Sequence, residues 1–139
     1  KSSYILNSIL GAMERCTAEF LAKHGADSQE IQHLHNEIFG NHVYGIRRYN
    51  ENMDMGPHQD MVVDGRDTIT IAVYLDDDYE GGELGIVQPG LDLSIKNRAG
   101  SIVVFPSGYL HESKPLNRGR KTIITHVHMP INKHIDMSV

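Results

Sequence analysis

The sequence has one cysteine, no tryptophan and no long apolar run. Cys16 has no second cysteine to pair with, so an intramolecular disulfide is excluded and a reducing, cytoplasmic environment is expected. No stretch approaches the roughly 20 apolar residues of a membrane span, and none resembles a signal peptide. Because Cys16 falls within an apolar helical pattern, we expect a packed and unreactive thiol.

Basic residues are also in deficit. Lys and Arg together number 13 against 18 Asp and Glu, which gives a formal net charge of -5. A protein that binds nucleic acid or an anionic membrane through a general basic face needs the opposite balance, so we expect neither partner. A chain of 139 residues is long enough to bury one core, and we expect a single domain over residues 1–139, with no indication of its oligomeric state.

Two helices are predicted before the first strand. Apolar residues recur at helical spacing over residues 3–24. Asp27, followed three residues later by Glu30, resembles a capping box that starts a second helix, and this helix should end at Gly40. Residues 1–40 are therefore interpreted as a helical support for the rest of the domain.

Residues 43–129 change to the two-residue period of β-strands. In the clearest strand, Thr68–Leu75, alternation places Ile71 and Val73 on one face and Tyr74 on the other. Further short strands are expected at residues 43–49, 84–88, 91–95, 101–105 and 121–129, separated by turns that contain glycine or proline. Helices followed by short strands at this spacing favour a mainly β fold, in which two helices pack on an antiparallel sandwich or jelly roll.

Chemistry is concentrated at residues 56–61, Gly-Pro-His-Gln-Asp-Met. His58 and Asp60, two residues apart on an extended segment, can direct an imidazole and a carboxylate at one point. His111, from a strand far along the chain, can complete three ligands on one face of a metal and leave the opposite face open. Two histidines and one carboxylate with open positions suit non-haem Fe(II) and oxygen chemistry, whereas a closed zinc site needs four ligands, usually including sulfur.

The last strand supplies a second candidate group. Lys121 shares a face with Val127 and other apolar residues, whereas Arg120 lies on the opposite face. The apolar face is the better candidate for the interior, and a lysine there needs an anionic partner because burying an unpaired charge is costly. Tyr74 is placed to share that anion, and Thr70 lies on the same face of its strand.

Together these motifs resemble the Fe(II)/2-oxoglutarate-dependent oxygenases, and within them most closely the prolyl 4-hydroxylase branch. The resemblance runs from about Val43 to Met129. It is carried by motifs in a fixed order: His58-x-Asp60, Tyr74-Leu75-Asp76, Glu80-Gly81-Gly82-Glu83-Leu84, Phe105, His111-Glu112 and Gly119-Arg120-Lys121. It implies a double-stranded β-helix, or jelly roll, with the two N-terminal helices packed on one sheet.

The resemblance also implies roles for the site residues. His58, Asp60 and His111 would hold Fe(II) and form the catalytic centre. The co-substrate 2-oxoglutarate would chelate the iron. Its far carboxylate would bind a basic residue nine or ten positions after the distal histidine, where Arg120 and Lys121 both fall. The facing of the last strand favours Lys121.

Two tyrosines match co-substrate positions of the family. Tyr74 falls where relatives contact the same carboxylate, and Tyr49, on the strand before the metal motif, resembles another such tyrosine. Thr70 is expected to bind the co-substrate beside them. The implied reaction uses O2 to convert 2-oxoglutarate to succinate and carbon dioxide and to hydroxylate an unactivated C–H bond, with ascorbate as an accessory reductant. Asp60 favours hydroxylation, because related halogenases carry a small residue at this position.

The sequence leaves the substrate open. A peptidyl proline is the default of the prolyl 4-hydroxylase branch, and a free amino acid or another small molecule is the alternative. Met53-Asp54-Met55 stands where relatives often carry an aromatic residue, and tryptophan is absent from the final strand. Both departures fall near the expected substrate entrance.

Two other hypotheses stand beside the oxygenase. His126 and His128 share a strand face and can ligate a metal, but no third ligand can be assigned from the sequence, and we expect them to be surface histidines. A non-catalytic sensor domain would bind 2-oxoglutarate and iron without turnover. Such domains usually lose a metal ligand or the basic co-substrate residue, and this chain retains both.

Overall fold

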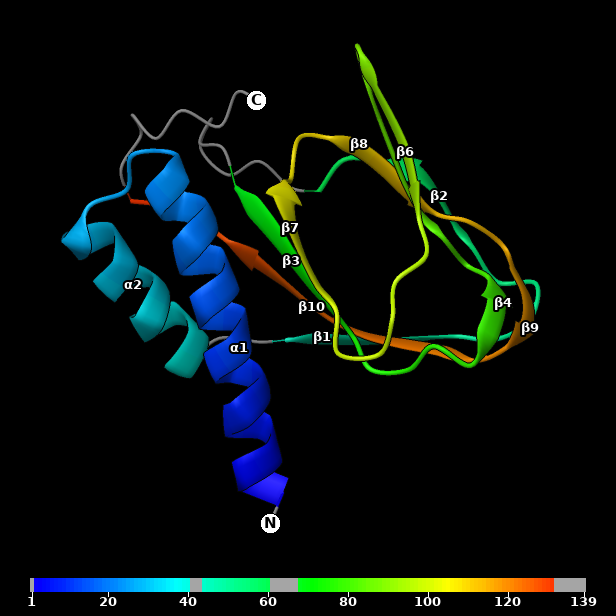
Figure 1. Cartoon of the computed structure of the whole chain (residues 1–139), viewed down its shortest axis with the longest axis horizontal. Helices are drawn as coiled ribbons and strands as arrows, with labels where there is room; N and C mark the ends of the chain where they lie inside the picture. Colours follow the sequence, from blue (N-terminus) through cyan, green and yellow to red (C-terminus); the bar gives the residue numbers. More distant parts are fainter. Residues whose placement is uncertain (1, 41–43, 61–67, 132–139) are drawn as a thin grey trace.

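The computed structural model describes residues 2–40, 44–60 and 68–131 (Figure 1). Two helices, α1 (Ser2–Lys23) and α2 (Ser28–Phe39), precede the strands. The strands are β1 (Gly45–Tyr49), β2 (Met55–His58), β3 (Ile69–Tyr74), β4 (Tyr79–Gly81), β5 (Leu84–Gln88), β6 (Leu91–Ile95), β7 (Ile102–Pro106), β8 (Leu110–Ser113), β9 (Leu116–Gly119) and β10 (Lys121–His128). The expected start of the first strand at Val43 lies outside the described residues.

The two helices form where the sequence predicts them. Asp27 caps α2, because its side chain accepts a hydrogen bond of 2.9 Å from the backbone N–H of Glu30. Along α1, Leu10, Met13 and Leu21 share one side of the helix and are buried in the core. Within the described part of the chain, neither helix is both long enough and apolar enough to cross a membrane.

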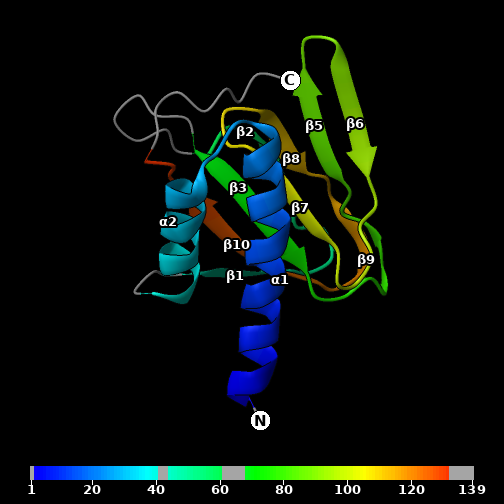
Figure 2. The same ribbon diagram turned by 60° about the vertical axis from the view of Figure 1, so that its left-hand side comes forward.

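The described strands pair in antiparallel fashion and form two four-stranded sheets and one short pair. The first sheet has the order β1-β10-β3-β7, the second has the order β2-β8-β5-β6, and β4 pairs with β9. Figure 1 shows the strands curling around a common interior, and Figures 1 and 2 both show the helices on the outer side of the first sheet. The predicted mainly β jelly roll, with two helices packed on one sheet, is confirmed.

The central strand β3 is buried along its whole length. Ile69, Ile71 and Val73 belong to the core under the helices. Thr70 and Tyr74 point to the other side of the sheet, where they line a pocket. The predicted division of this strand into two faces is confirmed, and both faces are interior because the helices cover one of them and the second sheet encloses the other.

Four short strands are missed by the sequence patterns: β2, β4, β8 and β9. Gly56 and Pro57 interrupt β2, and β4 falls within a stretch that looks like an acidic turn. These strands are held by partners that are distant in sequence, β2 by β8 and β4 by β9. A local pattern carries little information about such pairings, because strand stability depends largely on cross-strand neighbours.

Two predictions about single residues are wrong. Cys16 is exposed rather than packed, because it lies beside the stripe of α1 that carries Met13 and Thr17, both of which are buried. His126 and His128 are buried rather than exposed, because they face the side of the first sheet that the helices cover.

Candidate metal centre

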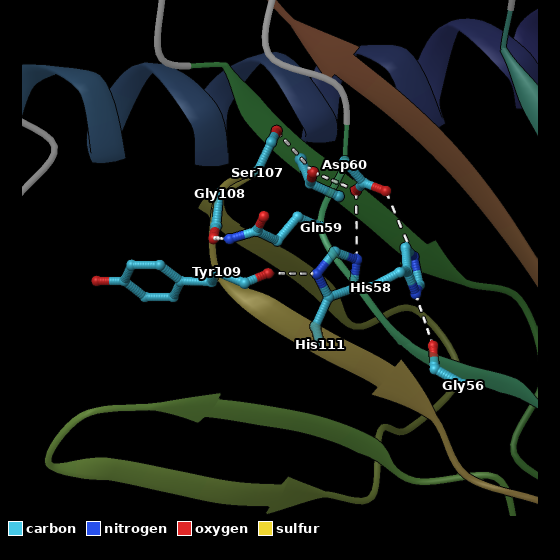
Figure 3. A network of polar contacts seen from close by, with 9 residues as sticks. Gly56, His58, Gln59, Asp60, Ser107, Gly108, Tyr109 and His111 are labelled. Atoms are coloured by element: carbon cyan, nitrogen blue, oxygen red, sulfur yellow. Dashed lines mark hydrogen bonds and ion pairs between the residues drawn. The ribbon is translucent and has the colours of Figure 1, made fainter.

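A histidine pair is brought together by the pairing of β2 with β8. The register places His58 directly opposite His111, and their ring centroids lie 4.3 Å apart. Asp60 follows just beyond the end of β2, with Oδ1 3.4 Å from His58 Nε2 and Oδ2 3.3 Å from His111 Nε2. Three ligand atoms therefore converge on one point, as Figure 3 shows.

The backbone holds both imidazoles in the orientation that a metal needs. His58 Nδ1 lies 2.8 Å from the carbonyl oxygen of Gly56, and His111 Nδ1 lies 2.7 Å from that of Tyr109 (Figure 3). A carbonyl only accepts, so Nδ1 carries the proton and donates it in each ring. Nε2 is then left as the lone-pair nitrogen, and both Nε2 atoms face Asp60.

Asp60 is fixed by a second layer of hydrogen bonds. The Thr70 hydroxyl donates to Asp60 Oδ2 at 2.6 Å and lies 2.8 Å from the Ser107 hydroxyl, and Asp60 N donates to the Ser107 carbonyl at 2.9 Å. Burial would raise the pKa of Asp60, but hydrogen bonds with His111 and Thr70 outweigh it and hold that pKa below its usual value. The carboxylate is therefore ionised, and its orientation is fixed by these hydrogen bonds.

The contact with Asp60 shifts the pKa of His111 in the opposite direction. Burial would lower its pKa, but in the protonated ring Nε2–H donates to Asp60, and this hydrogen bond, together with that of Nδ1–H to the Tyr109 carbonyl, raises the pKa overall. Asp60 thus attracts positive charge at His111 Nε2, and a divalent cation satisfies that demand in place of a proton. The donor set of two imidazole nitrogens and one carboxylate fits Fe(II), because it occupies one side of the ion and faces a pocket on the other.

The pocket continues from these three residues into the space between the two four-stranded sheets. Its lining includes Tyr49, Met55, Thr70, Tyr74, Phe105 and Lys121, and Arg47 is also among its wall residues. Tyr49 and Tyr74 are both buried. Burial raises the pKa of each phenol, so both are neutral hydrogen-bonding groups at physiological pH.

Lys121 lies at the buried end of the pocket. Its side chain is only 1% exposed, and Nζ donates to the Gly82 carbonyl at 2.8 Å and to the Ser113 hydroxyl. Nζ also lies 4.4 Å from the centroid of the Tyr49 ring. Burial, followed by repulsion from Lys96, lowers the pKa of Lys121 to about 8.

Burial lowers the pKa of Lys121 overall, although Glu83 and Asp76 favour its charged form electrostatically. Among the residues that the structure describes, no carboxylate lies within ion-pair distance of Nζ. A buried ammonium without a carboxylate is unfavourable unless an anion joins it. The structure therefore places a buried ammonium and three candidate metal ligands in one pocket.

Each residue predicted for the site from sequence can be located. His58, Asp60 and His111 converge, and Lys121, Tyr74 and Tyr49 line the same pocket. Arg120 is exposed and lies outside this pocket. Thr70 also lines the pocket, but its hydroxyl is engaged with Asp60 and Ser107.

Ser107 is a functional residue that sequence analysis missed. It is fully buried and holds both the side chain of Thr70 and the backbone of Asp60. A sequence signal was present, because Ser107 is a polar residue directly after the apolar run of β7. The Pro-Ser-Gly sequence around it looked instead like a turn.

Comparison with known proteins identifies the same family that the sequence motifs resemble. Residues 44–128, more than half of the chain, match the profile of the 2OG-Fe(II) oxygenase superfamily. A PKHD-type hydroxylase from Crocosphaera subtropica is 34% identical over 96 residues, which cover 63% of this chain and 43% of that protein. The chain thus spans less than half the length of the curated relatives that it matches.

Solved structures show a related fold. A prolyl-4-hydroxylase from Pseudomonas putida superposes with a TM-score of 0.55 at 25% identity, covering 63% of this chain and 51% of that one. A viral collagen prolyl hydroxylase from Paramecium Bursaria Chlorella virus-1 superposes with a TM-score of 0.57 at 23% identity, covering 88% of this chain and 73% of that one. The profile match shows that this chain belongs to the 2OG-Fe(II) oxygenase superfamily.

Proposed function

We propose that this chain carries an Fe(II)- and 2-oxoglutarate-dependent hydroxylase of the prolyl 4-hydroxylase type, with His58, Asp60 and His111 as the metal ligands. One observation carries the proposal: three candidate metal ligands open into a pocket that also holds a buried ammonium, which has no carboxylate within ion-pair distance among the described residues. A 2-oxoglutarate dianion suits this arrangement, because one end can chelate the metal while the distal carboxylate reaches Lys121.

The proposal gives each polar group in the pocket a role. Lys121 binds the distal carboxylate of 2-oxoglutarate, and Tyr49 and Tyr74 donate hydrogen bonds to it. Thr70 positions Asp60 through its hydroxyl group. Fe(II) held by His58, Asp60 and His111 would supply the oxygen chemistry, in which 2-oxoglutarate is converted to succinate and carbon dioxide, one atom of O2 enters succinate and the other enters a substrate C–H bond. Ascorbate would serve as an accessory reductant.

The pKa of Lys121 predicts how 2-oxoglutarate binding depends on pH. Below about pH 8 Lys121 is an ammonium, and above it the side chain loses the charge that attracts the distal carboxylate. We expect kcat/KM for 2-oxoglutarate to fall by up to about tenfold per pH unit above that point, as measured in initial-rate profiles. In Lys121→Arg the decline should move out of this range, because a guanidinium stays charged. An equal decline in both proteins would assign it to another group.

A peptidyl proline is the first candidate for the substrate. The curated relatives are named PKHD-type hydroxylases, and the two structural relatives are named prolyl hydroxylases. The deciding experiment measures succinate formation from 2-oxoglutarate with Fe(II) and ascorbate, with and without a proline-rich peptide, in wild type and in His58→Ala. Turnover that the peptide stimulates and the variant loses supports the proposal. Metal binding without turnover under every condition would support the sensor hypothesis instead.

Arg47 favours a second candidate, a small molecule with a carboxylate such as a free amino acid. Its side chain lines the pocket, and it stands beside Ile123 of β10 on the same face as Tyr49. A peptidyl proline has no carboxylate to match this guanidinium, whereas a free amino acid does.

Replacing Arg47 by alanine distinguishes the two substrate classes. For a carboxylate-bearing substrate we expect KM to rise by about 10- to 100-fold, the range for loss of a charged hydrogen bond. Arg48→Ala is the matched control, since Arg48 is the next residue on the same strand and points to the other face. An Arg47→Ala enzyme with unaltered KM for free amino acids would remove the support for this candidate.

A further inference from the structure

A second group of metal-ligating side chains lies on the helix side of the first sheet, away from the pocket. His33 and Glu37 are one turn apart on α2, and His128 is the last residue of β10. One ligand atom from each of the three lies within 4.8 Å of the others. Residues four apart on a helix project from the same side, so His33 and Glu37 present both donors to β10.

His128 faces a carboxylate with each of its ring nitrogens. Its side chain is fully buried, Nδ1 is hydrogen-bonded to Glu37 Oε2, and Nε2 has no hydrogen-bond partner among the residues that the structure describes. Glu30 Oε1 lies 3.8 Å from Nε2. When a metal occupies Nδ1 of a histidine, Nε2 carries the proton and turns to a carboxylate. Glu30 stands where that carboxylate is needed.

His33 brings a second imidazole to the cluster. Its Nε2 lies 3.1 Å from the carbonyl oxygen of Met129, so Nε2 carries the proton and Nδ1 is the lone-pair nitrogen. The rings of His33 and His128 lie 5.5 Å apart between centroids. His33 Nδ1 is therefore unprotonated, and an ion that joined the cluster would replace the proton between His128 Nδ1 and Glu37.

An ion can reach this cluster from solvent. The side chain of Glu37 is 25% exposed, whereas that of His128 is 0% exposed. Glu37 thus lies on the solvent side of the cluster and His128 on the buried side. Two imidazole nitrogens and a carboxylate oxygen suit Zn²⁺ and similar first-row divalent ions, and they leave one position of a tetrahedral ion for water.

We propose that His33, Glu37 and His128 form a second metal site, for a zinc-type divalent ion, which fastens α2 to the end of β10. The sequence alone suggested a metal held by His126 and His128. The proposed site keeps His128, but its other two ligands come from α2 instead of from the same strand. A histidine and a glutamate four residues apart on a predicted helix are the sequence signal for this pair.

The test uses the full chain and Zn²⁺ alone as the probe. A His58→Ala/Asp60→Ala variant removes two ligands of the first centre, so that binding reports on the second. We expect equilibrium dialysis to give one Zn²⁺ per chain and the thermal unfolding midpoint to rise by about 5 °C at saturating Zn²⁺. Adding either His33→Ala or Glu37→Gln should abolish both effects.

His35→Ala is the matched control, because His35 is on the same helix, is exposed and pairs with Glu14 instead. It should retain the ion and the thermal shift. His128 is left unchanged because it is fully buried and its loss can unfold the protein. Absence of Zn²⁺ binding in the double variant, or retention after His33→Ala and Glu37→Gln, would overturn the proposal. The cluster would then be a hydrogen-bonded contact between helix and sheet.

Discussion

His58→Ala is expected to lower 2-oxoglutarate turnover by at least about 100-fold and to reduce the Fe(II) content of the protein in parallel. Loss of a group that only supports a metal ligand already costs 10- to 100-fold, and His58 is itself placed as a ligand. Its side chain is 31% exposed, so truncation opens little space in the core. The loss should therefore appear in iron content and rate, while the thermal unfolding midpoint of the metal-free protein changes little.

Gln59→Ala provides the control for this change. Gln59 lies between the two proposed ligands and is exposed, and its Nε2 donates to the Gly108 carbonyl at 2.7 Å. The Gln59→Ala substitution alters the same segment without removing a candidate metal ligand. Iron content and turnover should stay within about twofold of wild type, as expected for a surface substitution. An equal loss in Gln59→Ala and His58→Ala would mean that the segment, rather than the imidazole, is what matters.

The parts of the site that sequence predicts are those governed by local periodicity. Alternation along β3 and β10 assigns Tyr74 and Lys121 to faces of their strands, and the structure places both in the pocket. The contact of His58 with His111 depends on the pairing of β2 with β8. Neither of those strands has a recognisable pattern, so their contact was suggested by chemistry and family resemblance.

Periodicity fails where the fold decides what covers a surface. The pattern of β10 correctly places His126 and His128 opposite Lys121, but it cannot show that helices far earlier in the chain cover them. The same limit applies to Thr70, whose hydroxyl is directed to Asp60 and Ser107 from different segments. Such support networks consist of long-range contacts and become visible only in three dimensions.

Lys121→Met is expected to raise the KM for 2-oxoglutarate by about 100-fold or more, because loss of one partner of a buried charge pair usually costs 2–5 kcal/mol. Arg120→Met is the matched control, since Arg120 precedes Lys121 on the chain but is exposed and outside the pocket. Its KM should stay close to wild type. The comparison decides which of the two basic residues binds the co-substrate.

Lys121→Met should weaken co-substrate binding without lowering the stability of the ligand-free protein. Without 2-oxoglutarate, Lys121 is a buried ammonium with its pKa lowered to about 8 by burial, so its folded form binds a proton less readily than its unfolded form. Between about pH 8 and the unfolded pKa of about 10.4, the unfolded chain holds more protons and stability rises with pH. Methionine removes the desolvation cost, so Lys121→Met should unfold at the same or a higher temperature than wild type at pH 7. The contrary outcome is a Lys121→Met protein that binds the co-substrate more weakly and also has a clearly lower unfolding midpoint. Lys121 would then stabilise the pocket through Gly82 and Ser113, and the loss of binding would result from destabilisation of the pocket.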